Sequence, residues 1–156
     1  MQPKILFLGT PEFAAHSLKK LIESNSYDIL GVITQPDKVS GRGNKLQAPP
    51  VKVIAEENSI AVLQPKSLKN FEDELKNFGE LDAVICVAYG KIIPKFFLDY
   101  PKKGAINIHP SLLPRWRGAA PIQWTLFSGD KKTGVALMQM DEGLDTGPVY
   151  CIENVE

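Results

Sequence analysis

The chain has 156 residues, about the length of one domain, and its 18 basic and 18 acidic side chains give a formal net charge of zero. A neutral chain has no overall electrostatic attraction to nucleic acid or to a membrane, so any such binding has to come from a local patch. Hydrophobic residues make up 44% and charged residues 23%, which is typical of a globular protein and excludes a disordered chain.

We expect neither a membrane helix nor a secretory signal in this sequence. Its longest nearly apolar run, 81–90, is about half the ~20 residues that a membrane helix needs, and it includes Asp82. No long apolar region with a small-residue cleavage site follows the N-terminus. We therefore expect a cytoplasmic protein without a membrane partner. Cys86 and Cys151 lack metal-ligand spacing, so we expect two unpaired thiols and no metal.

The first third of the chain predicts a β-α-β unit. The apolar run 4–8 is typical of a strand buried on both faces of a parallel sheet. A helix follows, with Thr10 as its expected N-cap and Pro11 at its first helical position. Residues 28–34 predict a second strand. Residues 35–50 carry three prolines and two glycines without either periodicity, so we expect an irregular loop that is functional or mobile.

The alternation continues to the end of the chain. In order, the predicted elements are a helix over 51–58, a strand over 61–63, an amphipathic helix over 67–77 with Leu68, Phe71 and Leu75 inward, a strand over 81–89, a short helix near 92–98, a strand over 104–109, a loop over 111–118, a helix over 119–127, a strand over 133–140 and a last strand from 147. This order predicts an α/β fold with a doubly wound, mainly parallel sheet. Its ligand site is expected beyond the carboxyl ends of the strands.

A polar pair follows one of these strands. Asn107 and His109 are two residues apart, so in a strand their side chains share one face and project side by side into the expected crevice. The alternative is that Asn107 caps a turn and His109 satisfies a buried backbone group. Spacing alone leaves both interpretations open.

The second polar motif is the segment 140–148, MDEGLDTGP, with three acids and two glycines between two predicted strands. Such a segment alone is usually a solvated turn, but in this fold it should lie beside His109. A carboxylate near an imidazole and a carboxamide supplies an acid–base group and carbonyl-polarising donors, as acyl transfer to an amine requires. The glycine patterns of nucleotide-binding loops and of serine hydrolases do not occur, which argues against both classes.

Five segments carry a family resemblance: FLGTPEFAA, TQPDKVSGRG, VAYGKIIP, INIHPSLLPRWRGAAPIQW and TGVALMQMDEGLDTGPV. Together they resemble the methionyl-tRNA formyltransferases, which are 10-formyltetrahydrofolate-dependent enzymes of Rossmann-like fold. The resemblance runs from Lys4 to about Tyr150. It implies transfer of a formyl group from 10-formyltetrahydrofolate, as co-substrate, to the α-amine of methionyl initiator tRNA in translation initiation.

The same resemblance implies the site residues. Asn107, His109 and Asp145 match the family's catalytic triad. The folate is expected to lie against Val87, Ala88, Tyr89, Gly90, Ser111, Leu112, Leu113, Pro114, Asp141 and Leu144. For tRNA, we expect contacts from Lys38, Arg42 and Lys45 in the 35–50 loop, although a surface insertion with ordinary lysines is the alternative.

Chemistry suggests a role for each member of the triad. Attack of an amine on the formyl carbon places negative charge on the formyl oxygen, so we expect Asn107 and His109 to donate hydrogen bonds there. Asp145 is expected to hold the imidazolium charge and to relay the amine proton towards the departing folate nitrogen.

Members of the resembled family are considerably longer than this chain. Residues 1–156 are therefore expected to form an incomplete N-terminal catalytic domain, without the family's C-terminal β-barrel, and to be monomeric. Alternatives remain open, because related enzymes would share the triad. They are a formyltransferase acting on a small amine, such as glycinamide ribonucleotide or an amino-sugar nucleotide, an enzyme that hydrolyses the formyl folate, and a non-catalytic folate- or RNA-binding fragment.

Overall fold

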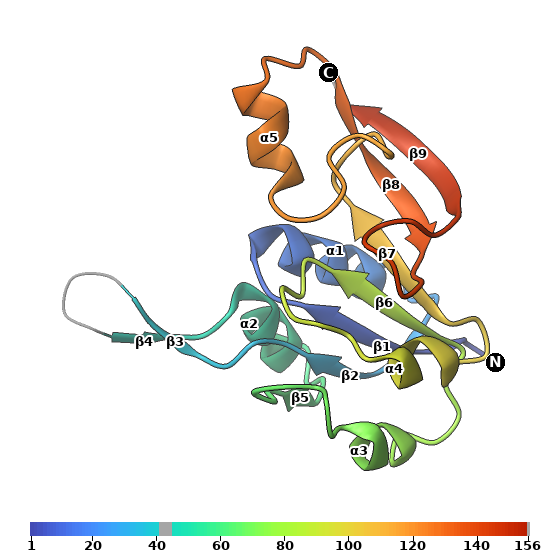
Figure 1. Cartoon of the computed structure of the whole chain (residues 1–156). Helices are drawn as coiled ribbons and strands as arrows, with labels where there is room; N and C mark the ends of the chain where they lie inside the picture. Colours follow the sequence, from blue (N-terminus) through green and yellow to red (C-terminus); the bar gives the residue numbers. More distant parts are fainter. Residues whose placement is uncertain (41–44, 156) are drawn as a thin grey trace.

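The central sheet has seven strands within residues 1–40 and 45–155, the part of the chain that the computed structural model describes. In chain order they are β1 (Lys4–Gly9), β2 (Asp28–Ile33), β5 (Val62–Leu63), β6 (Ala83–Val87), β7 (Ala105–His109), β8 (Thr133–Gln139) and β9 (Val149–Val155). Their spatial order is β5-β2-β1-β6-β7-β8-β9 (Figure 1). The strands from β5 to β7 are parallel, whereas β8 and β9 are antiparallel to their neighbours. The predicted mainly parallel sheet is confirmed.

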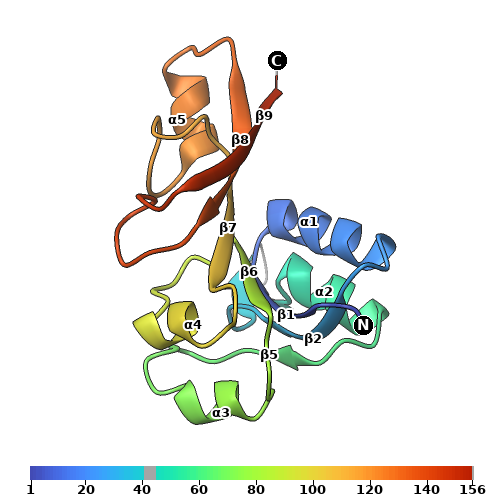
Figure 2. The same ribbon diagram turned by 90° about the vertical axis from the view of Figure 1, so that its right-hand side faces the viewer.

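Helices cover both faces of the parallel strands. They are α1 (Glu12–Glu23), α2 (Pro50–Glu57), α3 (Glu72–Lys76), α4 (Lys95–Asp99) and α5 (Pro121–Phe127). Helices α1 and α2 lie on one face, α3 and α4 lie on the other, and α5 lies beside β8 (Figure 2). In the described ranges, no helix is both long and apolar enough to cross a membrane.

The core alternates along β1, as the period of two in a strand requires. Leu6 and Leu8 pack in one hydrophobic cluster with Phe97 of α4, and Phe7 packs in the other with Leu18 of α1. Each of these side chains is buried. Because both faces of β1 are covered, its sequence is apolar throughout, which is why the strand is visible in the sequence.

Thr10 has a different role from the one predicted. The residue that caps α1 is Pro11, and no side chain caps this helix. The Thr10 hydroxyl instead donates to the Tyr89 carbonyl at 3.0 Å. The predicted N-cap is therefore wrong, because a partner from the turn after β6 takes this hydroxyl.

The helix predicted over 67–77 is shorter than its pattern suggested. Only α3 is helical, and the preceding residues form turns. Here the Ser67 hydroxyl accepts the Lys69 backbone N–H at 3.2 Å, a local hydrogen bond that competes with helix formation. The apolar positions are nevertheless buried as expected, since Leu68, Phe71 and Leu75 are at most 7% exposed.

The predicted irregular loop over 35–50 contains a hairpin. Strands β3 (Lys38–Ser40) and β4 (Lys45–Gln47) pair antiparallel, with Val39 opposite Leu46. The hairpin projects away from the body of the molecule (Figure 1). Each strand has only three residues, which is too short to show an alternating pattern. Arg42 lies outside the described residues.

The aromatic cluster beneath α4 provides a test of the core. Phe97 is fully buried and stacks on Phe71 with ring centroids 5.9 Å apart. Phe97→Ala should lower the free energy of unfolding by about 3–5 kcal/mol, because it removes the ring and leaves a cavity. The matched control is Phe127→Ala at a position 84% exposed, which should change stability by at most about 0.5 kcal/mol. Equal losses in urea unfolding would contradict this packing.

The two cysteines provide a second test. Both are free, Cys86 is buried in β6 and Cys151 is exposed on β9. Burial raises the pKa of the Cys86 thiol from its ordinary 9.0 to about 12, so almost no thiolate is present below pH 9. Iodoacetamide at pH 8 should therefore modify Cys151 and leave Cys86 intact by mass spectrometry, whereas both should react in urea. Comparable rates in the folded protein would contradict the burial of Cys86.

Candidate active site

A cavity of about 970 Å³ opens beyond the carboxyl ends of β6 and β7. Three regions line it: the turn after β6 together with α4, the end of β7 with residues 118–121, and the segment 140–145. This is the edge at which α/β sheets bind their ligands. The volume lies within the usual range for small-molecule sites.

Three predicted polar side chains meet in this cavity around one carboxylate. Asp145 Oδ1 accepts from Asn107 Nδ2 at 3.4 Å, and Oδ2 lies 3.6 Å from His109 Nδ1. The backbone N–H of Gly118 also donates to Oδ2, at 2.7 Å. The His109 and Asp145 side chains are 6% and 14% exposed. Two donors, the Asn107 amide and the Gly118 backbone, therefore converge on a nearly buried carboxylate that also faces His109.

The second ring nitrogen of His109 faces a backbone carbonyl. Nε2 lies 2.9 Å from the Trp116 oxygen. Because a carbonyl only accepts, Nε2 carries the hydrogen in this contact. Nδ1 is then the nitrogen that gains or loses a proton, and it faces Asp145. For His109 both interpretations hold, since it satisfies a backbone group and also lies in the crevice. Asn107 lies within β7 and donates to Asp145, so the turn cap considered for it is not seen.

Asp145 reaches this position by an indirect route. Since β8 is antiparallel, its last residue Gln139 pairs with Ile106 near the start of β7, away from the carboxyl end. The following segment therefore runs back along the sheet. Asp141 shapes it by accepting the Gly143 N–H at 2.9 Å and the Thr146 hydroxyl at 2.8 Å. Asp145 itself has a φ of 51°, a conformation that aspartate tolerates better than most residues.

Some of the predicted folate contacts line the cavity and others do not. Ala88, Tyr89, Gly90, Asp141 and Leu144 line the cavity. The turn after β6 offers its backbone there, with Ala88 at a φ of 45° and Gly90 at 77°. Thr10 and Gln35 hold this turn from behind, since both donate to the Tyr89 carbonyl, at 3.0 and 2.8 Å.

Two of the predicted folate contacts have buried side chains. The Tyr89 ring is 2% exposed within the core, where burial raises the pKa of its phenol to about 12. Val87 is fully buried with the α1 and α2 cluster and does not line the cavity.

The segment 111–114 does not line the cavity. Ser111 is buried, and its hydroxyl donates to the Arg115 carbonyl at 2.7 Å. Leu113 packs with Ala136 and Met138 of β8, and the Leu112 side chain lies against Gly134 of the same strand. The proposed folate contacts of Ser111, Leu112, Leu113 and Pro114 are not brought to the site, because the buried part of this loop is committed to β8.

Several lining residues were not singled out by the sequence. They are Cys86, Lys91, Ile92, Ile93, Pro94, Lys95, Leu98, Gly118, Ala119, Ala120 and Pro121. Gly118 has the clearest sequence signal, since a glycine follows the Arg-Trp-Arg run. Its φ is 84°, which glycine adopts without strain, and a Cβ there would lie 3.1 Å from the Leu144 side chain.

Within 1–40 and 45–155, no three His, Cys, Asp or Glu side chains gather in a way that could hold a metal ion. Asn107, His109 and Asp145 contact one another and the backbone of residues 116 and 118.

Comparison with known proteins places this site in context. Two curated relatives, both named methionyl-tRNA formyltransferase, come from Myxococcus xanthus and Clostridioides difficile. The first is 51% identical over 156 residues, covering 99% of this chain and 49% of the relative. The second is 54% identical over 146 residues, covering 92% and 47%. The chain thus spans about half the length of the curated relatives it matches.

Solved structures share the fold. A phosphoribosylglycinamide formyltransferase from Anaplasma phagocytophilum has a TM-score of 0.76 and 25% identity, covering 99% of this chain and 72% of its own. A formyltetrahydrofolate deformylase from Pseudomonas syringae has a TM-score of 0.75 at 22% identity, with coverages of 99% and 51%. The family described as formyl transferase matches residues 3–156. The chain belongs to the formyl transferase family.

Proposed function

We propose that this chain carries the catalytic site of an enzyme that transfers a formyl group from 10-formyltetrahydrofolate to the α-amine of methionyl initiator tRNA. The observation that carries the proposal is the convergence of Asn107 and His109 on Asp145 within one cavity. The two curated relatives, which are 51% and 54% identical to this chain, are named for this activity.

The reaction makes two demands on the site. The amine nitrogen bonds to the formyl carbon, the bond from that carbon to the folate nitrogen breaks, and one proton moves from the amine to the folate nitrogen. Negative charge gathers on the formyl oxygen during the attack, so a hydrogen-bond donor is needed there. A group that takes and returns a proton is needed beside it.

Asn107 serves as the donor. Its Nδ2 carries two hydrogens, one of which is directed at Asp145 Oδ1. The second is available to the formyl oxygen, and the bond to Asp145 fixes the orientation of the carboxamide. Loss of a donor of this kind typically costs ~10²–10³ in rate.

His109 and Asp145 serve as the proton carrier. Both His109 ring nitrogens already face protein acceptors, the Trp116 carbonyl and Asp145. We therefore revise the role expected from the sequence, in which His109 donates directly to the formyl oxygen. In the revised assignment the amine proton is held between Nδ1 and Asp145 Oδ2 before it passes to the departing nitrogen.

The cavity is suited to a folate co-substrate. Its walls combine apolar side chains, such as Ile92 and Leu144, with the backbone of the turn 88–90. A flat heterocycle with alternating donors and acceptors can pair with such backbone groups while its faces contact the apolar walls.

The β3–β4 hairpin is consistent with a formyl acceptor that carries phosphate groups. Lys38 is paired with Gln47, and Gln47 and Lys45 are two residues apart, so the two lysines share one face of the ribbon. Both are exposed, while Val39 and Leu46 occupy the opposite face. A pair of lysines on one face of a projecting ribbon is well placed for backbone phosphates of RNA. Arg42, proposed to contact tRNA, lies outside the described residues.

The catalytic assignment is tested by Asp145→Asn, which keeps the size of the side chain and removes its charge. We expect turnover of methionyl-tRNA in a formylation assay to fall about 100-fold or more, because proton transfer loses its carrier. His109→Ala should fall similarly, and the double variant should be little worse than either, because the residues act as one unit.

The matched control for the loss of charge is Asp82→Asn. Asp82 lies at the amino end of β6, where its carboxylate accepts the Lys4 backbone N–H. This variant should leave turnover near the parent value. Small amines are supplied as alternative acceptors in the same assay. Formylation of these alone, or near-normal turnover in Asp145→Asn, would contradict the proposal.

The hairpin assignment is tested by replacing Lys38 and Lys45 together by Ala. We expect KM for tRNA to rise and the salt dependence of tRNA binding to weaken by about one unit of slope per lysine, since fewer counterions are released. KM for the folate should not change. Lys69→Ala, an exposed lysine near α3, is the control. An equal loss towards both substrates would show instead that the hairpin supports the fold.

A further inference from the structure

The hydrogen bond that orients His109 depends on a single carbonyl. His109 Nε2 lies 2.9 Å from the Trp116 oxygen, so the position of the Trp116 backbone decides which ring nitrogen carries the fixed hydrogen. Trp116 lies in the loop that follows β7, seven residues beyond His109. What holds Trp116 therefore bears on the chemistry of the imidazole.

Trp116 has a backbone conformation that a bulky residue rarely adopts. Its φ is 58°, in the left-handed region, where a large side chain is disfavoured. Such a conformation persists only where the surrounding structure holds it in place. The indole ring supplies part of this support, since it stacks on Trp124 of α5 with centroids 5.9 Å apart and planes 12° apart.

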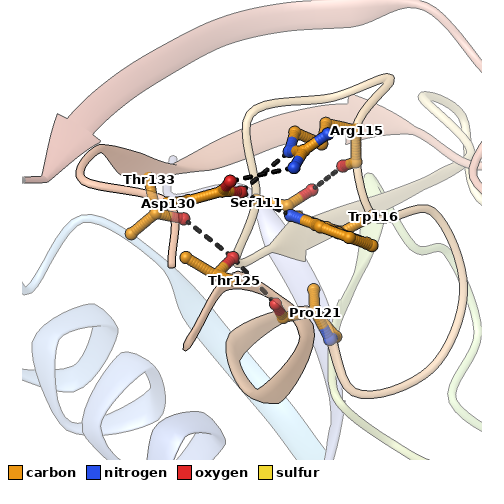
Figure 3. A network of polar contacts seen from close by, with 7 residues as sticks. All are labelled: Ser111, Arg115, Trp116, Pro121, Thr125, Asp130 and Thr133. Carbon is orange, nitrogen blue, oxygen red and sulfur yellow. Dashed lines mark hydrogen bonds and ion pairs between the residues drawn. The ribbon is translucent and has the colours of Figure 1, made fainter. Parts of the chain in front are cut away.

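Asp130 supplies the polar part of the support. This residue lies in the turn between α5 and β8, and its Oδ2 accepts the Trp116 indole N–H at 2.9 Å (Figure 3). Arg115 donates to the same carboxylate through Nε and Nη2, both at 2.8 Å. The Arg115 guanidinium also lies 4.3 Å from the centre of the Trp116 ring. The Asp130 carboxylate thus binds both Arg115 and Trp116, and it fixes the edge of the indole ring.

The Asp130 carboxyl stays ionised at the neutral pH of an assay. Hydrogen bonds from Arg115, and then from the Trp116 indole, hold the pKa of this carboxyl below its ordinary 3.8. The Asp130 carboxylate is therefore charged, and its bonds to Arg115 and Trp116 are present, at pH 3.8 and above. They are lost only as the pH falls through the lowered pKa of this carboxyl. The backbone around it is tied down as well, because the Ser111 hydroxyl donates to the Arg115 carbonyl at 2.7 Å.

We propose that Asp130 is a positioning residue for the transfer reaction, acting through the Trp116 indole to keep the Trp116 carbonyl on His109 Nε2. The hydrogen on Nε2 is then fixed, and proton exchange of His109 is confined to Nδ1, opposite Asp145. The catalytic consequence rests on the proposed function, whereas the effect on the imidazole does not. Asp130 itself does not line the cavity.

The effect on the imidazole is tested by nitrogen NMR of ¹⁵N-histidine-labelled protein. The sequence has two histidines, and His16 on the exposed side of α1 serves as an internal reference. Trp116→Phe removes the indole N–H and keeps a ring for stacking. Asp130→Ala removes the acceptor and gives a second, independent variant. Glu72→Gln, which breaks the Lys76–Glu72 ion pair on α3, is the matched control.

In the parent, we expect His109 Nε2 to carry its hydrogen whether the ring is neutral or charged. In Trp116→Phe and Asp130→Ala, the His109 resonances should move towards a mixture of tautomers, while those of His16 should not move. In the formylation assay, kcat should fall about tenfold, while KM for the folate should stay within about twofold. A tenfold loss is the scale seen when residues that orient a metal-bound histidine are removed. Glu72→Gln should match the parent in all measurements.

Unchanged His109 resonances in the variants would overturn the proposal, and so would a tautomer change without loss of kcat. If the parent transfers no formyl group to any acceptor, the proposed function fails, and the tautomer measurement alone decides whether Asp130 positions the imidazole. If one of the two variants does not fold, the other carries the test.

Discussion

The Asp145 carboxylate holds the active-site cavity together. One oxygen accepts from Asn107 on β7, and the other accepts from the Gly118 N–H and faces His109. Strand β7, the loop that holds Gly118 and the 140–145 segment therefore meet on one carboxylate. A buried carboxylate is costly unless donors surround it, so its burial and the positions of these segments depend on one another. The arrangement gives a reason for a glycine at 118, where the backbone has to come close to Leu144.

The framework of this fold was readable from the sequence because parallel strands covered on both faces are continuously apolar. Residues 4–8 and 81–89 show this most clearly, and they contain β1 and β6 at the centre of the sheet. The hairpin in the 35–50 loop and the start of α3 were not readable, although the short strand at Val62–Leu63 was. The hairpin strands have three residues each, and the Ser67 hydroxyl diverts the chain from a helix that its apolar spacing would permit.

The polar residues of the site were readable in kind but not in arrangement. The spacing of Asn107 and His109 placed them on one face of a strand, and the family resemblance supplied Asp145. Nothing in the sequence indicated that β8 would be antiparallel, so that the 140–145 segment would have to run back along β7. The Trp116 carbonyl and the Asp130 carboxylate were equally hidden, because backbone acceptors and tertiary partners leave no periodic pattern.

The turn after β6 has a consequence for the thermodynamics of binding. Its two left-handed residues, Ala88 and Gly90, are held by donors from Thr10 and Gln35 that converge on the Tyr89 carbonyl. Both contacts are made between groups of the chain itself. A molecule that fills the cavity therefore meets a preorganised floor and does not have to pay for ordering this stretch of backbone on binding. The conformational entropy of this turn therefore adds little to the cost of binding at this edge of the sheet.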